Sequence, residues 1–230
     1  MGGFTKLARF FATSLFATSL MLPAQAGEEF LPPSGKGRVV VMLSGQSGTE
    51  SYRQVAAVVA QLGYDVVLLD TPSLLGTHGK ALRDAIAQAQ LGPHAMPGKT
   101  GLVGFSLGGG LALEYGPAWS DQVAVVVAWY PATGFVIDPV AWSADLRVPV
   151  VMFAGEADTY NNCCLVGKAR ALADLAKSHA AQFELTTYPG VKHGFVLGGA
   201  NFDAAAFADA LSRTRLALAG ALSDDHASSP

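Results

Sequence analysis

A serine between two glycines is the residue whose setting points most directly to chemistry. Ser106 lies in the sequence G-F-S-L-G at 104–108, directly after an apolar run and directly before a segment with helical character. A sharp turn at this junction would lift the hydroxyl to the edge of a sheet, at a helix N-terminus, where developing negative charge is favoured. Side chains two residues before and after the serine would collide with the neighbouring chain, so glycine is expected there. Ser106 is therefore the predicted nucleophile.

A serine hydroxyl is a poor nucleophile until a base removes its proton, so a histidine and an orienting carboxylate are required. His193 lies between the last expected strand and the last expected helix, in a loop that faces the same sheet edge as Ser106. The other histidines are His78 and His94 in earlier loops, His179 at a helix end, and His226 in the tail. Position therefore selects His193 as the predicted general base.

Asp158 is the predicted carboxylate partner of this histidine. It lies in G-E-A-D at 155–158, just past the carboxyl end of an expected strand. The chain order Ser106, Asp158, His193 agrees with that of the hydrolases that carry a nucleophile elbow. Three other carboxylates remain open as alternatives: Glu156, Asp138 and Asp145.

An oxyanion hole would complete such a site. The backbone N–H of Leu107 is one expected donor, and a second should come from the loop S-G-Q-S-G at 44–48, where Gln46 is the natural candidate. Ser47 in the same loop lacks both the strand immediately before it and the spacing of the elbow. It is therefore not the expected nucleophile.

Strands and helices must alternate along the chain to position these residues. The expected strands are 38–43, 65–70, 100–105, 122–130, 148–154 and 183–188, and the expected helices are 50–62, 81–91, 108–115, 165–179 and 202–219. The segment 27–36 reads as an irregular lead-in. This alternation predicts an α/β fold with a mostly parallel sheet and helices on both of its faces. Only 17 residues separate the strands ending at 130 and beginning at 148, too few for a cap domain.

Composition narrows the possible partners. The 230 residues include 15 Lys and Arg against 18 Asp and Glu, giving a formal charge of −3, and only 14% are charged, against about 25% in typical domains. Such a chain offers no broad basic field for a phosphate backbone, so a nucleic acid is not the expected partner. A small molecule is therefore the expected substrate. The length after residue 26 is expected to form one domain, at 27–230.

The first 26 residues have the pattern of a secretory signal peptide. Lys6 and Arg9 precede an uncharged stretch at 10–22, and A-Q-A at 24–26 supplies the small-x-small cleavage pattern. We therefore expect an exported protein, periplasmic or secreted, with no membrane span after cleavage. No later segment approaches 18 uninterrupted apolar residues.

Cys163 and Cys164 are adjacent and are the only cysteines. A zinc site is not predicted, because the sequence offers no second pair of ligands. Three states remain open: a vicinal disulfide, two free thiols, or an intermolecular bond. Of the aromatic residues, Trp129 and Tyr130 end a strand near the expected site, where they could line an acyl pocket.

Three motifs together resemble those of the dienelactone hydrolase family of α/β-hydrolases: G-F-S-L-G-G at 104–109, G-E-A-D at 155–158 and K-H-G-F at 192–195. The resemblance extends from about residue 38 to residue 219. It implies a capless α/β-hydrolase fold, a nucleophile-His-Asp triad, and hydrolysis of an ester or lactone through an acyl-enzyme, with no metal and no cofactor. The founding members of the family carry cysteine where this chain has Ser106, which widens the expected substrates towards ordinary esters.

The predicted function is therefore that of a serine hydrolase acting on a small ester or lactone. Two alternatives remain open. An acyltransferase would use the same triad but pass the acyl group to an alcohol, and a binding domain of the same fold would carry no chemistry at all.

Overall fold

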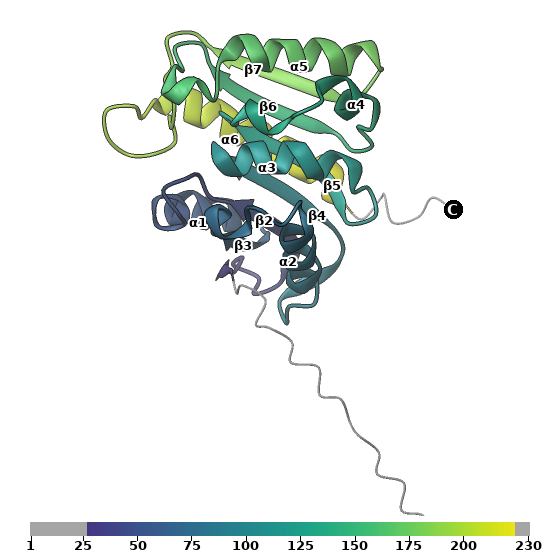
Figure 1. The fold of residues 1–230 in the computed structure, drawn as a ribbon. Coiled ribbons are helices and arrows are strands. Elements are labelled where there is room, and N and C mark those ends of the chain that lie inside the picture. Colours follow the sequence, from purple (N-terminus) through teal and green to yellow (C-terminus); the bar gives the residue numbers. More distant parts are fainter. Residues whose placement is uncertain (1–26, 224–230) are drawn as a thin grey trace, which may run out of the picture.

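A seven-stranded sheet runs through residues 27–223, the part of the chain that this computed structural model describes (Figure 1). Its strands are β1 (Glu28–Phe30), β2 (Gly37–Leu43), β3 (Asp65–Leu69), β4 (Ala95–Phe105), β5 (Val123–Trp129), β6 (Val150–Gly155) and β7 (Phe183–Tyr188). The strand order is β1-β3-β2-β4-β5-β6-β7, and every neighbouring pair is parallel except β1 with β3. The predicted signal peptide and the tail after residue 223 lie outside the described residues.

Helices cover both faces of the sheet, as predicted. They are α1 (Arg53–Ala60), α2 (Lys80–Gln90), α3 (Leu107–Tyr115), α4 (Pro139–Ala144), α5 (Val166–Ser178) and α6 (Ala204–Leu222). The apolar residues of α1 and α6 belong to one core cluster and those of α2, α3, α4 and α5 to the other. Within residues 27–223, no helix combines the length and apolar character needed to cross a membrane.

Strand β2 shows why the central strands are continuously apolar. Val40 and Met42 belong to the cluster on the α1 and α6 face, whereas Val39, Val41 and Leu43 belong to the cluster on the opposite face. All five are fully buried. A parallel strand covered by helices on both sides needs apolar residues at every position, which produces a run rather than an alternation.

Two elements, β1 and α4, lie in segments that were expected to be irregular. Strand β1 lies in the expected lead-in and pairs antiparallel with β3, from Glu28 opposite Leu68 to Phe30 opposite Val66. Three residues carry no periodic signal, so only the distant partner strand defines this one. Helix α4 lies in an expected loop, where the side chain of Asp138 caps it by accepting a 3.0 Å hydrogen bond from the N–H of Ala141. An Asp-Pro pair at a helix start was a readable signal for it.

The remaining predicted elements are present with shifted ends. The largest shift is in β4, which begins at Ala95 rather than at residue 100 and changes its register against β5 between Thr100 and Gly101. Between β5 and β6 the chain forms only α4 and a short 3₁₀ turn at Thr133–Phe135. The fold therefore leaves the carboxyl ends of the strands without a cap domain, as predicted.

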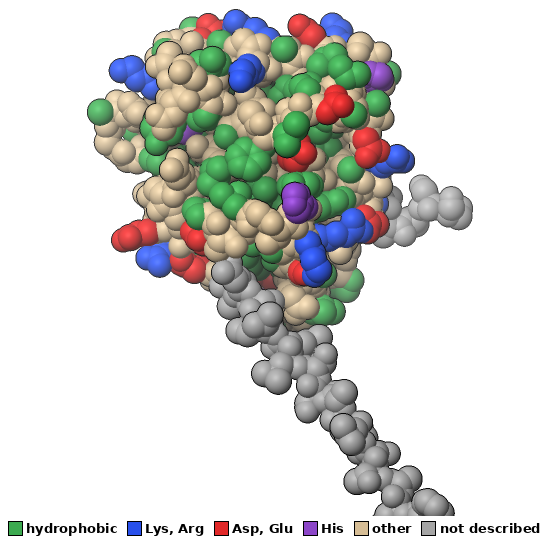
Figure 2. Space-filling model, in the orientation of Figure 1, with side chains coloured by type: hydrophobic (Ala, Val, Ile, Leu, Met, Phe, Trp, Pro, Cys, Tyr) green, Lys and Arg blue, Asp and Glu red, His purple; other side chains and the backbone are tan. Residues whose placement is uncertain are grey.

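On the face that α3, α4 and α5 cover, Lys and Arg side chains lie interspersed with Asp and Glu (Figure 2). Exposed ion pairs of the described residues include Lys80 with Asp84, both on α2, and Arg83 with Asp121.

Candidate active site

Ser106 occupies the sharp turn between β4 and α3. Its backbone adopts φ 50° and ψ −112°, a region that residues with side chains rarely adopt. Its N–H donates to the carbonyl of Trp129 at 3.0 Å, and its carbonyl accepts from the N–H groups of Gly110 and Ala132 at 2.9 and 2.8 Å. Contacts from two segments therefore hold the strained geometry in place, as expected at a functional turn.

The two glycines around the serine are required by close packing. A Cβ atom on Gly104 would lie 2.3 Å from the carbonyl oxygen of Gly108. A Cβ atom on Gly108 would lie 2.5 Å from the carbonyl oxygens of both Leu43 and Ser44. These backbone atoms cannot move aside, so both positions of the G-x-S-x-G sequence must be glycine for the mechanical reason anticipated from the sequence.

The structure brings the three predicted triad residues together. Ser106 Oγ lies 2.9 Å from His193 Nε2, and His193 Nδ1 lies 2.7 Å from Asp158 Oδ2. The side chain of Asp158 is fully buried and that of His193 is 13% exposed. Both ring nitrogens of the histidine are thus engaged, one by the serine and one by the carboxylate, in the geometry that serine activation requires.

The carboxylate is held at both of its oxygens. While Oδ2 faces His193, Oδ1 of Asp158 accepts a 3.0 Å hydrogen bond from the backbone N–H of Tyr160. A buried carboxylate needs such donors, because an unpaired charge away from water is costly. The loop after β6 therefore fixes the acid before any substrate arrives.

The alternative acids are engaged elsewhere. Asp138 caps α4, and Asp145 forms an exposed ion pair with Arg147. Glu156 accepts hydrogen bonds from Arg170 and from the Thr187 hydroxyl. None of the three contacts His193 among the described interactions.

The alternative histidines also lie away from the site. His94 faces Glu29 at 3.0 Å, and His179 follows the last turn of α5. His78 lies in the loop before α2 with a φ of 49°, and His226 lies outside the described residues.

The predicted oxyanion donors flank the serine. Within the described chain, the N–H groups of Leu107 and Gln46 donate to no protein acceptor. Loop 44–48 is fixed beside the elbow because the N–H of Gly108 donates to the carbonyl of Ser44 at 3.1 Å. Two free donors at the edge of the elbow fit the requirements of an oxyanion hole. The hydroxyl of Ser47, by contrast, faces Ser51 at 3.4 Å rather than a histidine.

Tyr52 packs beneath this loop and was not anticipated from the sequence. A Cβ atom on Gly45 would lie 2.3 Å from the Tyr52 hydroxyl, so a side chain here would have to displace the buried Tyr52 ring. Burial raises the pKa of Tyr52 to about 12, although the nearby Tyr130 hydroxyl and the Gly45 backbone lower it. The phenol therefore stays protonated and neutral beside the oxyanion loop.

Two further tyrosines contact the histidine ring. Tyr160 stacks on His193 with ring centroids 4.5 Å apart and an interplanar angle of 7°, and Tyr130 meets the same ring edge-on at 4.9 Å. No sequence pattern marks Tyr160, because its position against the histidine depends on the conformation of a loop. Trp129 is fully buried in the core, and neither it nor Tyr130 lines the cavity at Ser106. The interpretation of this pair as an acyl-pocket lining was therefore wrong.

An open cavity of about 340 Å³ lies at the serine. Apart from Ser106 and His193, its lining consists of uncharged residues: Gln46, Ser47, Tyr52, Tyr160, Gly194, Leu197, Gly198, Ala200 and Asn201. No Lys, Arg, Asp or Glu of the described chain faces it. The cavity can therefore hold a small, uncharged group next to the serine hydroxyl.

Cys163 and Cys164 form a disulfide with each other, which is one of the three states left open by the sequence. The carbonyl of Cys163 accepts hydrogen bonds from the backbone N–H and the hydroxyl of Thr133 at 3.1 and 3.2 Å. These bonds tie the loop after β6 to the loop after β5. The disulfide thus begins five residues after Asp158, in the same loop.

The model of the family described as "Dienelactone hydrolase family" matches residues 26–220. Among curated proteins, none matches the sequence.

Solved structures share the fold at low identity. A Klebsiella pneumoniae protein assigned to the dienelactone hydrolases is 20% identical with a TM-score of 0.67, over 80% of this chain and 88% of that chain. Est1E from Butyrivibrio proteoclasticus is 14% identical with a TM-score of 0.64, over 83% and 91%. An esterase from Thermogutta terrifontis, Est2, is 18% identical with a TM-score of 0.63, over 84% and 86%.

Proposed function

The chain belongs to the dienelactone hydrolase family and is a carboxylic ester hydrolase, and from this premise we propose that it cleaves small uncharged esters with a Ser106-His193-Asp158 triad. One observation carries the proposal: the unbroken relay of 2.9 and 2.7 Å contacts from the serine hydroxyl through the imidazole to the buried carboxylate. A binding domain without chemistry would have no use for this arrangement at a strained turn.

In the first half of the reaction, Ser106 Oγ attacks the ester carbonyl while His193 Nε2 takes its proton. Asp158 holds Nδ1, which keeps the acceptor lone pair on Nε2 and stabilises the imidazolium that forms. The negative charge that develops on the carbonyl oxygen is received by the N–H groups of Leu107 and Gln46. His193 then protonates the leaving alcohol, and an acyl group remains on Ser106.

In the second half, water takes the place of the alcohol. His193 removes a proton from it, the hydroxide attacks the acyl-serine, and the same donors stabilise the second oxyanion. When this intermediate collapses, the bond between the acyl carbon and Ser106 Oγ breaks, His193 returns the proton to Oγ, and the free acid leaves. The absence of a cap leaves the carboxyl ends of the strands accessible, so that water and product can exchange without a large opening motion.

The size and lining of the cavity define the substrate class. A volume of about 340 Å³ lies at the lower end of the usual range for small-molecule sites, roughly 300 to 1,000 Å³. Its uncharged lining offers no cation to pair with a carboxylate on the substrate, and leaving such a charge unpaired is unfavourable. We therefore infer a neutral ester or lactone with a short acyl group.

Two structural relatives accord with this substrate class. The Thermogutta terrifontis esterase has been solved with propionate bound, a three-carbon acid, and also after phosphonylation by sarin. A further relative, P91, is a dienelactone hydrolase-like promiscuous phosphotriesterase. An organophosphorus reagent is accordingly a suitable covalent probe for Ser106.

A panel of nitrophenyl esters tests the proposal. Acetate, propionate, butyrate, octanoate and a half-ester of succinate vary acyl length and charge, and Ser106→Ala protein measures the background. We expect kcat/KM to be largest for the short neutral esters. Equal or better turnover of the succinate half-ester would contradict the neutral substrate class, and no turnover above the Ser106→Ala background with any ester would contradict the esterase itself.

Product analysis with added alcohols separates hydrolysis from acyl transfer. A hydrolase should form mainly the free acid when methanol or glycerol is present at moderate concentration. Predominant formation of the new ester would instead assign the chain to the acyltransferases.

We also propose that the enzyme is exported after cleavage behind Ala26. The pattern at 1–26 supports this, because a charged start, an apolar stretch and A-Q-A occur in the required order. N-terminal sequencing of protein from the periplasm or medium of an expressing bacterium should begin at Gly27. Retention of Met1 in the cytoplasmic fraction would contradict export.

A further inference from the structure

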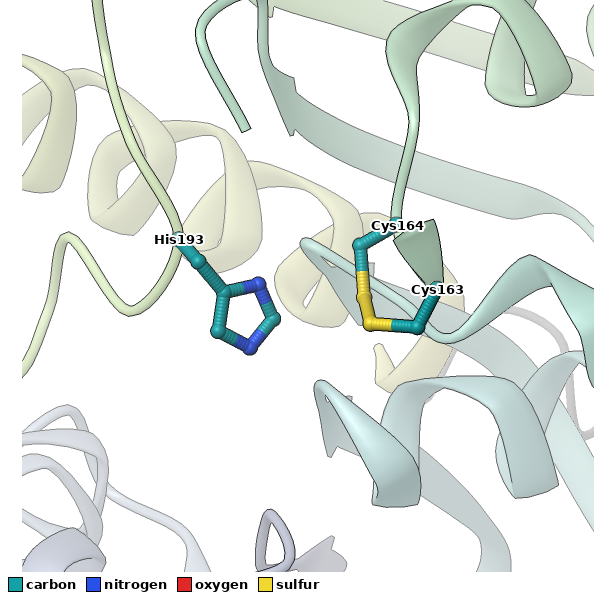
Figure 3. Close-up of side chains that lie close together, drawn as sticks. All are labelled: Cys163, Cys164 and His193. Atoms are coloured by element: carbon teal, nitrogen blue, oxygen red, sulfur yellow. A yellow bond between two sulfur atoms is a disulfide. The ribbon is translucent and has the colours of Figure 1, made fainter. Parts of the chain in front are cut away.

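The disulfide lies directly beside the histidine of the triad. Figure 3 shows Cys163 and Cys164 on one side of a gap and the His193 ring pointing into it from the opposite loop. The two sulfurs and a ring nitrogen lie within 4.8 Å of one another. Cys164 is buried, whereas Cys163 is partly exposed. Three possible ligand atoms from two separate loops therefore lie close together.

We propose that Cys163, Cys164 and His193 form a binding site for a thiophilic divalent cation such as Zn²⁺ once the disulfide is reduced, and that the bound ion inactivates the enzyme. The disulfide is the closed state of this site. The inactivation rests on the proposed triad, whereas binding of the ion does not.

The ligand set fits such an ion in type and spacing. Zinc is bound by thiolate sulfurs at about 2.3 Å and imidazole nitrogens at about 2.0 Å in tetrahedral geometry. Two ligands of one tetrahedral ion then lie roughly 3.5 to 3.8 Å apart. Three ligand atoms that already lie within 4.8 Å of one another need only small side-chain rotations to reach these positions. Solvent would supply the fourth ligand.

Charge favours the same ion. Two thiolates neutralise a divalent cation, and the buried carboxylate of Asp158 lies one hydrogen bond away from His193 Nδ1. The cavity beside them presents no Lys or Arg of the described chain that would repel a cation.

Metal binding is incompatible with the triad, whichever ring nitrogen is used. His193 Nδ1 faces Asp158 and Nε2 faces Ser106, so a metal ion on either nitrogen displaces one of the two contacts. If the metal binds Nε2, His193 can no longer accept the proton of Ser106. If it binds Nδ1, the contact between His193 and Asp158 is lost. The expected result is reversible loss of esterase activity.

The chemistry balances in two steps. Reduction breaks the S–S bond with two electrons and two protons. Two external thiols supply both and become a disulfide, whereas a phosphine supplies only the electrons, and water provides the two protons and the oxygen of the phosphine oxide. In the second step the two thiols release two protons to solvent as the sulfur–metal bonds form. Oxidised protein lacks these thiolates and cannot form the site.

Cadmium titration of the purified mature enzyme tests the site without reference to activity. Phosphine-reduced and oxidised enzyme are each titrated with Cd²⁺, and thiolate-to-metal charge-transfer absorption in the ultraviolet is followed. We expect one Cd²⁺ per chain in the reduced protein and no absorption change in the oxidised protein. Because the oxidised protein has the same sequence, it is the matched control. Equal titrations of the two forms would overturn the proposal.

Variants then assign the ligands. Cys163→Ser should lose the charge-transfer band, and His193→Ala should weaken Cd²⁺ binding at least about tenfold, the scale on which ligand-shell changes act. His94→Ala, which changes a histidine at the other end of the sheet, should bind as the wild type does. Binding by His193→Ala as tight as in the wild type would show a dithiol site without the histidine and overturn the assignment.

Zn²⁺ inhibition completes the test. Reduced enzyme should lose activity with a midpoint that follows the Zn²⁺ affinity and regain it on chelation, whereas oxidised enzyme should keep its activity at the same Zn²⁺ concentration. If no ester is turned over at all, the proposed function fails while the cadmium titration still decides the metal site. Binding without inhibition would contradict the proposed link to the triad.

Discussion

Two buried aspartates at opposite ends of the sheet have very different surroundings. Asp158 follows the carboxyl end of β6, where the Tyr160 N–H and the His193 ring contact its two oxygens. Asp65 begins β3 at the amino end of the sheet, is 1% exposed, and receives no hydrogen bond at either oxygen within the described chain. Burial, with Glu29 nearby, raises the pKa of Asp65 to about 6.

The difference shows that burial alone does not make a functional carboxylate. Without donors, a buried carboxyl group tends to take up a proton and lose its charge. With donors from a fixed loop, it can stay charged and orient a base. The carboxyl end of a parallel sheet provides such loops, because each strand there leads into a turn and a helix.

The cavities at the amino and carboxyl ends of the sheet differ in the same way as the two aspartates. At the amino ends of β5, β6 and β7 a cavity of about 940 Å³ is larger than the one at Ser106. Among its charged residues, Arg147 pairs with Asp145, and Arg213 pairs with Glu184 and Asp209. At the serine, fewer groups converge, but they form a connected relay. Connectivity rather than volume therefore distinguishes the candidate active site.

The largest expected effect comes from removing the proposed nucleophile, Ser106. Ser106→Ala should lower kcat by on the order of 10⁵-fold or more, because the acyl-enzyme cannot form. Ester hydrolysis and labelling by a fluorophosphonate probe measure it. Ser47→Ala, in the same cavity, should retain activity and labelling. Activity in Ser106→Ala, or a label on Ser47, would contradict the assignment.

The second-largest expected effect comes from replacing Asp158, the buried aspartate that follows β6. Asp158→Asn should lower kcat by about 10⁴-fold, because an amide no longer selects the tautomer that accepts the serine proton. Asp138→Asn and Asp145→Asn are the matched controls, and steady-state kinetics should place both near the wild type. If Asp158→Asn were fully active and one control inactive, the acid would lie after β5 instead.

At the amino end, Asp65 should affect stability rather than activity. Its carboxyl group titrates near 3.9 in the unfolded chain and about 6 in the folded one, so the folded state holds the proton more tightly. The free energy of unfolding therefore contains a contribution that is present below pH 4 and is lost as the pH rises to 6, about 2 to 3 kcal/mol in all.

Asp65→Asn should remove this loss, because asparagine does not titrate. Relative to the wild type, the variant should gain about 2 to 3 kcal/mol in urea unfolding between pH 4 and pH 7. Asp84→Asn, an exposed residue paired with Lys80, should show no comparable gain. The same pH dependence in wild type and Asp65→Asn would refute the unpaired-carboxylate interpretation.

The smallest expected effect comes from replacing Tyr160, whose ring stacks on His193. Tyr160→Ala should lower kcat/KM by roughly 3- to 10-fold, since an aromatic pair contributes about 0.5 to 1.5 kcal/mol. Tyr160→Phe keeps the stacking and should retain nearly full activity. A Phe variant as impaired as the Ala variant would instead point to the hydroxyl.

Much of the fold followed from local patterns. Apolar runs with intervening amphipathic segments predicted a parallel sheet with helices on both faces, because burial on two sides requires apolar residues at every strand position. Strand β1 was not predicted, because it has only three residues and its strand geometry depends on pairing with β3. Helix α4 was missed even though Asp138 and Pro139 marked its start.

For the site, the sequence by itself predicted that Ser106 and His193 lie at one edge of the sheet, since the carboxyl ends of parallel strands meet there. Only the tertiary structure decided which carboxylate reaches His193, that Tyr160 stacks on it, and that Cys163 and Cys164 lie beside it. These outcomes depend on contacts between loops distant in sequence. The residue pattern within a loop does not predict such contacts, because the packing of the elements that the loop joins sets its conformation.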